Sequence, residues 1–382
     1  MRFDIFCHVV DHLGDAGVCL RLVRRLALTH YTSDDHFTSS DKDSLRLFCD
    51  QPELIKKLAG EEVLRELITH GVEILPWESA NQSLSAEIFP DVVIETFSCE
   101  LPTEYLTQLK NIHTPLIINV EYLSAESWTI EAHGLPSPPS HTDDWLRYFY
   151  YPGFTSSSGG LLQGKLPAIE DHQEYVPRSL EQVWRQLRPS SEAKRVCVFT
   201  YGGDKLLRLL DQLHASHLPL DLLFCDEPAI QTAEQWLGWP LTNPVTRNHL
   251  QCIAMPFIPQ DDFDWLLHHC DLNLVRGEDS FVRAQFAGKP FIWDIYPQDI
   301  DAHLKKLDAF LEVYLKDATP NAQRAVLEAM HWQEFSHWWP SLHAMSQHAM
   351  MWRQELIKSQ IHGDLAIRLR DFIQEKLTSS PP

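Results

Sequence analysis

The sequence predicts an α/β protein with two domains, each built around a mainly parallel β-sheet. Short apolar runs typical of buried strands alternate with helical patterns in both halves of the chain, which indicates successive strand–helix–strand units. The length of 382 residues also exceeds what one hydrophobic core usually serves. We therefore expect two sheets in two domains.

The expected elements follow in chain order. In the first half, strands are expected at 2–10, 92–97 and 115–120, and helices after 17, around 52–69 and at 101–110. In the second half, strands are expected at 195–201, 219–225, 250–257, 271–275 and 291–295, with helices between them. Proline-rich 135–140 and the Ser/Gly stretch 155–160 indicate a surface loop and the approach to a linker. The predicted division is a first domain over 1–165, completed by a C-terminal helix over 350–382, a linker over 166–190, and a second domain over 191–349.

Composition indicates a cytoplasmic enzyme that binds neither membranes nor nucleic acid. No apolar stretch approaches the roughly 20 residues of a membrane span, and Met1–Cys7 reads as a first strand, not a signal peptide. The eight cysteines contain no C-x-x-C pair, so buried reduced thiols are expected. A net charge of −21 repels nucleic acid and anionic lipid, so a partner should present positive charge where it docks.

The turn after the first strand carries two carboxylates. Asp11 and Asp15 follow the first strand, at the sheet edge where open α/β proteins bind ligands, and Gly14 and Gly17 permit close backbone approach. The alternative is that Asp15 merely caps the following helix. Two further carboxylates, Glu95 and Glu121, end strand-like runs and are expected to extend an acidic rim that suits a cationic acceptor.

The segment 271–290 reads as a strand, a charged turn and a helix, and it predicts a phosphate site. Asp279 or Ser280 can cap the helix, while Arg276 at the strand end offers a guanidinium to an anion. Glu278 is costly beside a phosphate unless it serves another part of the ligand, which favours a nucleotide that carries a sugar. The alternative is an ordinary capped helix. His268–Cys270 lacks the spacing of a metal site, and no metal is expected.

Five motifs in order along the chain resemble those of the bacterial protein-arginine rhamnosyltransferases that modify translation elongation factor P: VVDHLGDAGV (9–18), VIETF (93–97), EYLSAE (121–126), PFIPQ (256–260) and RGEDSFVRAQ (276–285). The resemblance implies a GT-B glycosyltransferase with two Rossmann-like domains facing each other across a cleft. It further implies dTDP-β-L-rhamnose as donor, no cofactor, inversion at the anomeric carbon, and one arginine of elongation factor P as acceptor. The first domain is then expected to bind the acceptor and the second the nucleotide sugar.

The resemblance also assigns residues. Its catalytic carboxylates correspond to Asp11, Asp15 and Glu278, and its donor pocket corresponds to Phe199, Tyr201, Phe257, Gln260, Arg276, Asp279 and Ser280. An aromatic ring can stack on thymine, a glutamine can pair with a base edge, and an arginine can hold the diphosphate. For each strand aromatic taken singly, core packing is the alternative. For the whole chain, the alternatives are another GT-B enzyme, such as an epimerase or a small-molecule transferase, or a non-catalytic nucleotide-sugar sensor.

Overall fold

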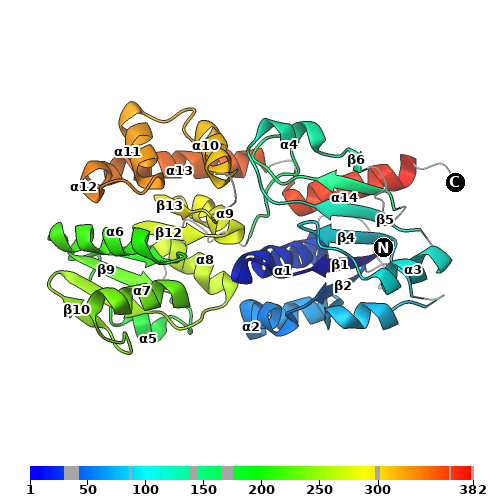
Figure 1. Cartoon of the computed structure of the whole chain (residues 1–382), viewed down its shortest axis with the longest axis horizontal. Coiled ribbons are helices and arrows are strands. Elements are labelled where there is room, and N and C mark those ends of the chain that lie inside the picture. Colours follow the sequence, from blue (N-terminus) through cyan, green and yellow to red (C-terminus); the bar gives the residue numbers. More distant parts are fainter. Residues whose placement is uncertain are drawn as a thin grey trace. The chain divides into compact units, whose positions relative to one another are not determined.

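The structure is a computed structural model that describes residues 1–29, 43–85, 88–112, 114–137, 145–164, 175–296, 302–360 and 363–379. The chain divides into two compact units: unit 1 comprises Met1–Gly164 and Ser359–Pro382, and unit 2 comprises Lys165–Lys358. Each unit is a β-sheet with helices on both faces (Figure 1). The predicted α/β class is confirmed.

Unit 1 contains a seven-stranded sheet, counted over the described residues, in the order β3-β2-β1-β4-β5-β7-β6. All neighbours are parallel except the pair β6–β7. The strands are β1 (Arg2–Cys7), β2 (Ser44–Cys49), β3 (Val72–Pro76), β4 (Val92–Thr96), β5 (Leu116–Val120), β6 (Pro136–Ser137) and β7 (Arg147–Tyr150).

Helices cover both faces of this sheet, because its strands are apolar on both sides. On one face, side chains such as Phe3 and Ile5 pack with α1 (His12–Leu28), α2 (Pro52–Thr69) and α14 (Leu365–Ser379). On the other face, Phe6 packs with α3 (Thr103–Ile112) and the 3₁₀ turn η2 (Trp77–Gln82). A short helix, α4 (Ser127–Ala132), follows β5.

The C-terminal segment completes unit 1. Leu365, Ala366, Leu369 and Ile373 of α14 are buried in the same core as α1. Arg25 of α1 pairs with Asp364 (Nε–Oδ2 2.6 Å), which anchors the start of α14. The prediction of a single helix over 350–382 is wrong, since α13 (Leu342–Ser359) ends before α14 begins and belongs to unit 2 up to Lys358.

Unit 2 contains a six-stranded sheet, again counted over the described residues, in the order β10-β11-β9-β8-β12-β13, with only β10 antiparallel. Its strands are β8 (Lys194–Val198), β9 (Leu220–Phe224), β10 (Val245–Arg247), β11 (Leu250–Ala254), β12 (Leu272–Arg276) and β13 (Phe291–Asp294). Besides α13, its helices are α5 (Glu181–Trp184), α6 (Asp204–Ala215), α7 (Glu227–Leu237), α8 (Gln260–His269), α9 (Glu278–Ala287), α10 (Ala302–Tyr314), α11 (Pro320–Met330) and α12 (Phe335–Trp338).

The eight expected strands are all present, with ends shifted by a few residues. The sequence analysis missed β2, β3, β6, β7 and β10, and it started the first helix too late, since α1 begins at His12. The expected linker contains the short helix α5. Residues 165–174 of that region, and 138–140 of the predicted surface loop, lie outside the described residues.

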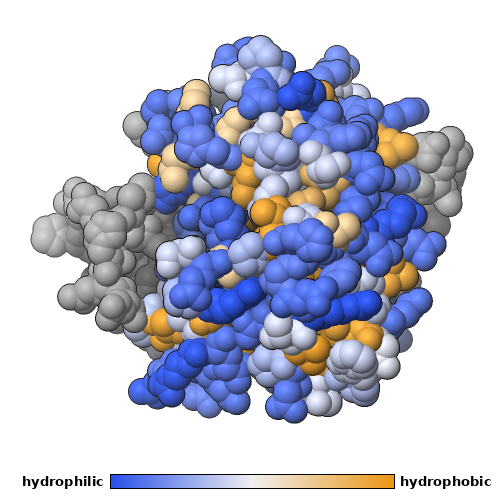
Figure 2. Space-filling model, turned by 90° about the vertical axis from the view of Figure 1, so that its left-hand side faces the viewer, coloured by the Kyte–Doolittle hydropathy of each residue, from blue (hydrophilic) through white to orange (hydrophobic). Residues whose placement is uncertain are grey.

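The cysteines are mostly buried, and the molecular surface is mainly hydrophilic on the face described below. The eight cysteines are unpaired, and all but Cys225 are fully buried, as predicted. In the part of the chain that the structure describes, we find no helix long and apolar enough to cross a membrane. The face drawn in Figure 2 is mainly hydrophilic, and its apolar residues lie in small separate areas.

Both sheets reverse their strand order beside the first strand of the unit. In unit 1 the chain runs from β1 to β2 and β3, and then returns to β4 on the other side of β1. In unit 2 it runs from β8 toward β11, and then returns to β12 on the other side of β8. Open α/β sheets bind ligands outside the carboxyl ends of the strands at such switch points. The loops after β1, β4, β8 and β12 are therefore the places to look for a site.

Candidate active site

The loop after β1 holds Asp11 and Asp15 at the switch point of unit 1. Asp11 is the residue before α1 and is partly exposed, whereas Asp15 lies in the first turn and is only 3% exposed. Asp15 Oδ2 accepts the backbone N–H groups of Val10 (2.9 Å) and Asp11 (2.8 Å). A Cβ on Gly14 would lie 2.6 Å from Asp11 Oδ2, so a larger residue there would displace that carboxylate from its present position. Asp15 thus closes the turn ahead of the helix through a single oxygen atom.

The surroundings of Asp15 strengthen it as a proton acceptor. Burial raises the pKa of Asp15, and the charge of Asp11 raises it further. Hydrogen bonds from the backbone at Asp11 and Val10 and from the Tyr122 side chain oppose the rise without cancelling it. A carboxylate with a raised pKa accepts a proton more readily than an exposed one, which suits a general base.

The loop after β4 adds an aromatic pair to this edge. Phe97 and Ser98 both have left-handed backbone angles (φ 57° and 54°), which are uncommon for residues other than glycine. The Phe97 ring stacks on Tyr122, with centroids 4.3 Å apart and planes 14° apart. Since Tyr122 also bonds to Asp15, the loops after β1, β4 and β5 are joined through these side chains. Sequence analysis missed both aromatics, although Phe97 ends one quoted motif and Tyr122 lies in the next.

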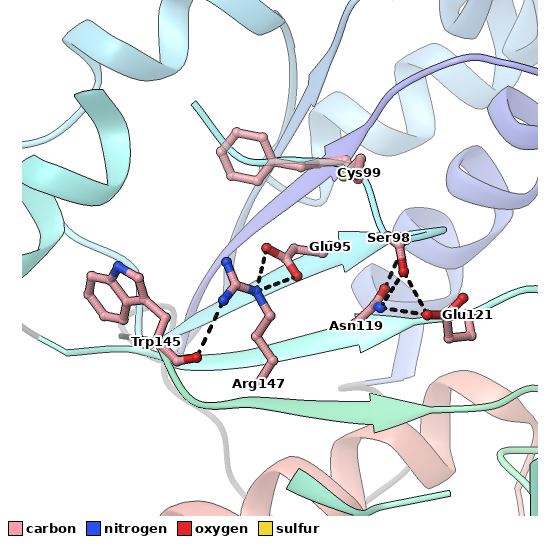
Figure 3. Close-up of polar contacts among 8 residues, drawn as sticks. Glu95, Ser98, Cys99, Asn119, Glu121, Trp145 and Arg147 are labelled. Carbon is pink, nitrogen blue, oxygen red and sulfur yellow. Dashed lines mark hydrogen bonds and ion pairs between the residues drawn. The ribbon is translucent and has the colours of Figure 1, made fainter. Parts of the chain in front are cut away.

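Polar side chains fix Glu121 at the end of β5 (Figure 3). The Ser98 hydroxyl and the Asn119 amide both donate to Glu121 Oε1, each at 2.7 Å. Asn119 also donates to Ser98 Oγ at 2.8 Å and accepts the Ser98 N–H at 3.1 Å. Glu121 is partly exposed and has a defined orientation at the sheet edge.

Glu95 has a different role from the expected one. It is buried on β4 and pairs with Arg147 of β7, whose Nε lies 2.9 Å from Glu95 Oε2 (Figure 3). The prediction that Glu95 belongs to an exposed acidic rim is therefore wrong. Its charge neutralises an arginine within the sheet, which burial requires of both groups.

In unit 2, Arg276 lies at the end of β12 and is buried. It contacts two aromatic residues that were predicted and one carboxylate that was not. Its guanidinium lies 5.0 Å from the ring centroid of Phe199 and 4.6 Å from that of Tyr201. Its Nε lies 2.8 Å from Oδ2 of Asp226, the residue before α7. The structure thus brings Phe199, Tyr201 and Arg276 together, as expected of one pocket.

Two buried carboxylates near Arg276 were missed. Burial raises the pKa of Asp226 to about 7, although Arg276 lowers it. Burial also raises the pKa of Asp294, whose Oδ2 accepts the Tyr201 N–H at 2.8 Å. Both residues stand just after or at the end of apolar strands, so the signal used for Asp11 could also have found them.

The start of α9 differs from the prediction. Gly277 (φ 66°) precedes the helix, and within the described residues no side chain caps it, so the prediction of Asp279 or Ser280 as cap is wrong. The Ser280 hydroxyl donates to the Arg276 carbonyl, so in this arrangement its proton is not offered to a phosphate. Backbone N–H groups of the first turn and the helix dipole remain suited to an anion.

The other predicted residues of this helix start have side-chain partners. Glu278 Oε1 lies 2.5 Å from Nζ of Lys306 on α10, which neutralises the carboxylate that seemed costly beside a phosphate. Gln260, the first residue of α8, donates to Asp279 at 2.8 Å. Phe257, in the loop before α8, is 39% exposed, so a ligand could reach its ring.

The model of the family "Elongation-Factor P (EF-P) rhamnosyltransferase EarP" matches residues 3–374 of the chain. The chain belongs to the EarP family. Curated EarP-family relatives named protein-arginine rhamnosyltransferase include one from Pseudomonas putida, 35% identical over 98% of this chain and 99% of its own length. Another, from Shewanella oneidensis, is 33% identical over 98% of both chains.

Solved structures agree with membership of the EarP family. A structure that describes EarP-mediated arginine glycosylation of translation elongation factor EF-P has a TM-score of 0.63 and 26% identity, covering 98% of this chain and 99% of its own. A UGT transferase from Siraitia grosvenorii bound to UDP has a TM-score of 0.54 at 12% identity, covering 98% and 99%, and shows the fold alone. The predictions of a GT-B fold and of a glycosyltransferase in this family are confirmed.

Proposed function

We propose that this EarP-family enzyme transfers L-rhamnose from dTDP-β-L-rhamnose to the guanidinium of one arginine of EF-P, in the cytoplasm and with inversion at the anomeric carbon. Unit 1 binds the acceptor and unit 2 binds the nucleotide sugar. The observation that carries the proposal is Asp15, a buried carboxylate with a raised pKa at the unit 1 switch point. Family membership supplies the reaction that such a base would serve.

The acceptor chemistry explains why more than one carboxylate is needed. A guanidinium has a pKa above about 12 and is a poor nucleophile while its charge is delocalised. Asp11 and Asp15 bind two of its N–H edges and concentrate the positive charge away from the attacking nitrogen. That nitrogen forms a bond to C1 of rhamnose while the bond from C1 to the diphosphate oxygen breaks. Asp15 takes the proton that the new C–N bond releases.

The donor site is assigned to the loops of unit 2. Arg276 and the backbone N–H groups at the start of α9 stabilise the charge that the departing dTDP gains. Glu278, neutralised by Lys306, orients the sugar or the acceptor. We assign the thymine contact to Phe199, Tyr201, Phe257 and Gln260, and the diphosphate contact to the Arg276 guanidinium and the backbone N–H groups of Asp279 and Ser280. The reaction as proposed uses only protein groups and no metal or cofactor.

Co-expression of the chain with EF-P tests the proposal. Intact-mass analysis should show one added deoxyhexose on EF-P, and replacement of the acceptor arginine by lysine should abolish it. Purified protein with dTDP-rhamnose and EF-P should repeat the transfer in vitro. A nucleotide-sugar sensor would bind the donor without transfer, and an epimerase would alter the donor without EF-P. Either result would overturn the proposal.

A further inference from the structure

The edge of unit 1 that carries Asp15 also presents a preorganised carboxylate. Glu121 Oε1 receives two hydrogen bonds, from Ser98 and Asn119, and these hold one carboxylate oxygen in place (Figure 3). Ser98 is itself fixed in a left-handed conformation by Asn119. A side chain that is already ordered loses little conformational entropy when a partner binds. Glu121 is therefore built to receive a positive group at low entropic cost.

An exposed indole is connected to this carboxylate through Tyr151. The Glu121 backbone N–H donates to the Tyr150 carbonyl at 3.0 Å, which places the end of β5 next to the end of β7. The following residue, Tyr151, has its pKa raised by burial and by the charge of Glu121. The Trp128 ring of α4 packs edge-on against the Tyr151 ring, with centroids 5.4 Å apart. Tyr151 itself is buried, at 8% exposed, and it supports the partly exposed Glu121 and the exposed Trp128, which we together call the indole–carboxylate surface.

The exposure of Trp128 is unusual for this chain. Of the twelve tryptophans, Trp128 and Trp239 are the two with more than half of the residue exposed, at 51% and 54%. An exposed indole leaves apolar area in water, and burial of such a ring is a common source of affinity at protein interfaces. Trp239 lies in unit 2, between α7 and β10, and is therefore not part of the unit 1 sheet edge that carries Asp11, Asp15 and Glu121. It provides a matched comparison.

We propose that the indole–carboxylate surface is where the folded acceptor protein docks. Trp128 covers an apolar part of the acceptor next to the modified arginine, and Glu121 pairs with a positive group of the same protein. This inference rests on the proposed function, because it takes EF-P as the occupant. A positive contact group on the acceptor suits this edge, because the chain carries −21 overall and Asp11, Asp15 and Glu121 share one sheet edge.

The test compares two tryptophan variants in the full chain. Trp128→Ala should raise both the Kd for EF-P and the KM for EF-P by about tenfold or more, because a buried aromatic anchor is lost. Its kcat and its KM for dTDP-rhamnose should stay near wild type. Trp239→Ala should leave all four constants unchanged. Trp128→Phe should fall between wild type and Trp128→Ala, and it serves in place of the alanine variant if thermal melting shows that variant to be unfolded.

Two variants test the role of Glu121: one replaces Glu121 itself, and the other removes a hydrogen bond that orients its carboxylate. Glu121→Gln should lower the association rate with EF-P at low salt and reduce the salt dependence of that rate. Ser98→Ala removes one of the two hydrogen bonds to Glu121 and should give a smaller effect of the same sign. Biolayer interferometry with immobilised EF-P measures the association rates of the two variants and of wild type at each salt concentration.

The outcomes separate the two proposals. If wild type modifies EF-P but Trp128→Ala binds it normally, the docking surface is overturned and the function stands. Equal losses in the Trp128 and Trp239 variants, or no binding of EF-P by wild type, would also overturn it. If Trp128→Ala changes the oligomeric state of the free enzyme instead, the occupant is a second copy of the chain, which contradicts the inference. If wild type binds EF-P through Trp128 without transfer, the docking surface stands and the proposed function fails.

Discussion

Arg276 and Asp226 form a buried pair at the switch point of unit 2, with Nε 2.8 Å from Oδ2. Burial raises the pKa of Asp226 to about 7, so the carboxylate changes charge near neutral pH. While Asp226 is charged, it offsets the positive charge of Arg276, which would otherwise attract a diphosphate. A bound diphosphate raises the pKa of Asp226 further, because it adds negative charge nearby. Donor binding and protonation of Asp226 should therefore favour each other.

The affinity for dTDP-rhamnose should consequently rise as the pH falls from about 8 to about 6, by at most about tenfold per pH unit. Calorimetric titration in buffers of different ionisation enthalpy should detect proton uptake on binding. Both phosphates of the donor are esterified, so the donor lacks the ionisation near pH 6 of a phosphate monoester. Asp226→Asn should bind with little pH dependence, and Arg276→Ala should bind about ten- to a hundredfold more weakly. A flat profile for wild type would refute the coupling.

Asp15→Asn should separate chemistry from folding. The two backbone N–H groups both bond to Oδ2, and the amide oxygen of asparagine can accept them in the same way. The thermal melting temperature and donor affinity should therefore stay close to wild type. The transfer rate should fall by about a hundredfold or more, because the proton acceptor is lost. Near-normal transfer by this variant would show that Asp15 serves only to close the turn.

Tyr122→Phe should move the pH dependence of transfer. The Tyr122 hydrogen bond lowers the pKa of Asp15, so its removal raises that pKa and protonates the base at a higher pH. The acidic limb of kcat should shift toward alkaline pH, while the ring still stacks on Phe97. Asp11 and the backbone N–H groups of Val10 and Asp11, the other groups that influence Asp15, stay in place. Tyr148→Phe makes the same change on β7 and serves as the control. It should leave the pH dependence of kcat unchanged.

Lys306→Met should weaken donor binding by about tenfold, because it removes the cation that pairs with the Glu278 carboxylate at the proposed diphosphate site. Binding of thymidine, which carries no charge, should change little. Lys305→Met removes an exposed charge from the neighbouring position of α10 and serves as the control. A second change, Glu278→Gln, should restore part of the affinity to the Lys306 variant. Equal weakening of thymidine and dTDP-rhamnose would point instead to a general distortion of the pocket.

Several strands that sequence reasoning found contain an uninterrupted apolar run, such as 92–94 of β4 and 291–293 of β13, which suffices to indicate a buried parallel strand. The ones that it missed include β2 and β7, where Arg46 and Arg147 interrupt the apolar pattern. Their charges are neutralised by Asp4 of β1 (2.6 Å from Arg46) and Glu95 of β4 (2.9 Å from Arg147). These partners lie on other strands, so local patterns did not reveal them.

The candidate site likewise has residues that local sequence patterns predict and contacts that they do not. The positions of Asp11, Asp15 and Arg276 at strand ends follow from the strand pattern and the switch-point rule. The partner of Glu278, in contrast, lies 28 residues away on another helix. The Ser280 hydroxyl could bond either to a ligand or to the carbonyl four residues before it, and only the folded backbone shows that it takes the carbonyl.

The return of α14 to unit 1 has a consequence for biosynthesis. Proteins emerge from the ribosome at about 5–20 residues per second, and domains usually fold in the order of their synthesis. Here, the core around α1 lacks Leu365, Ala366, Leu369 and Ile373 until the last part of the chain has emerged. Arg25 and Asp43 likewise lack their partners Asp364 and Arg370 until then. Unit 2 has all of its strands earlier, so the half of the enzyme that is made first is the half that finishes folding last.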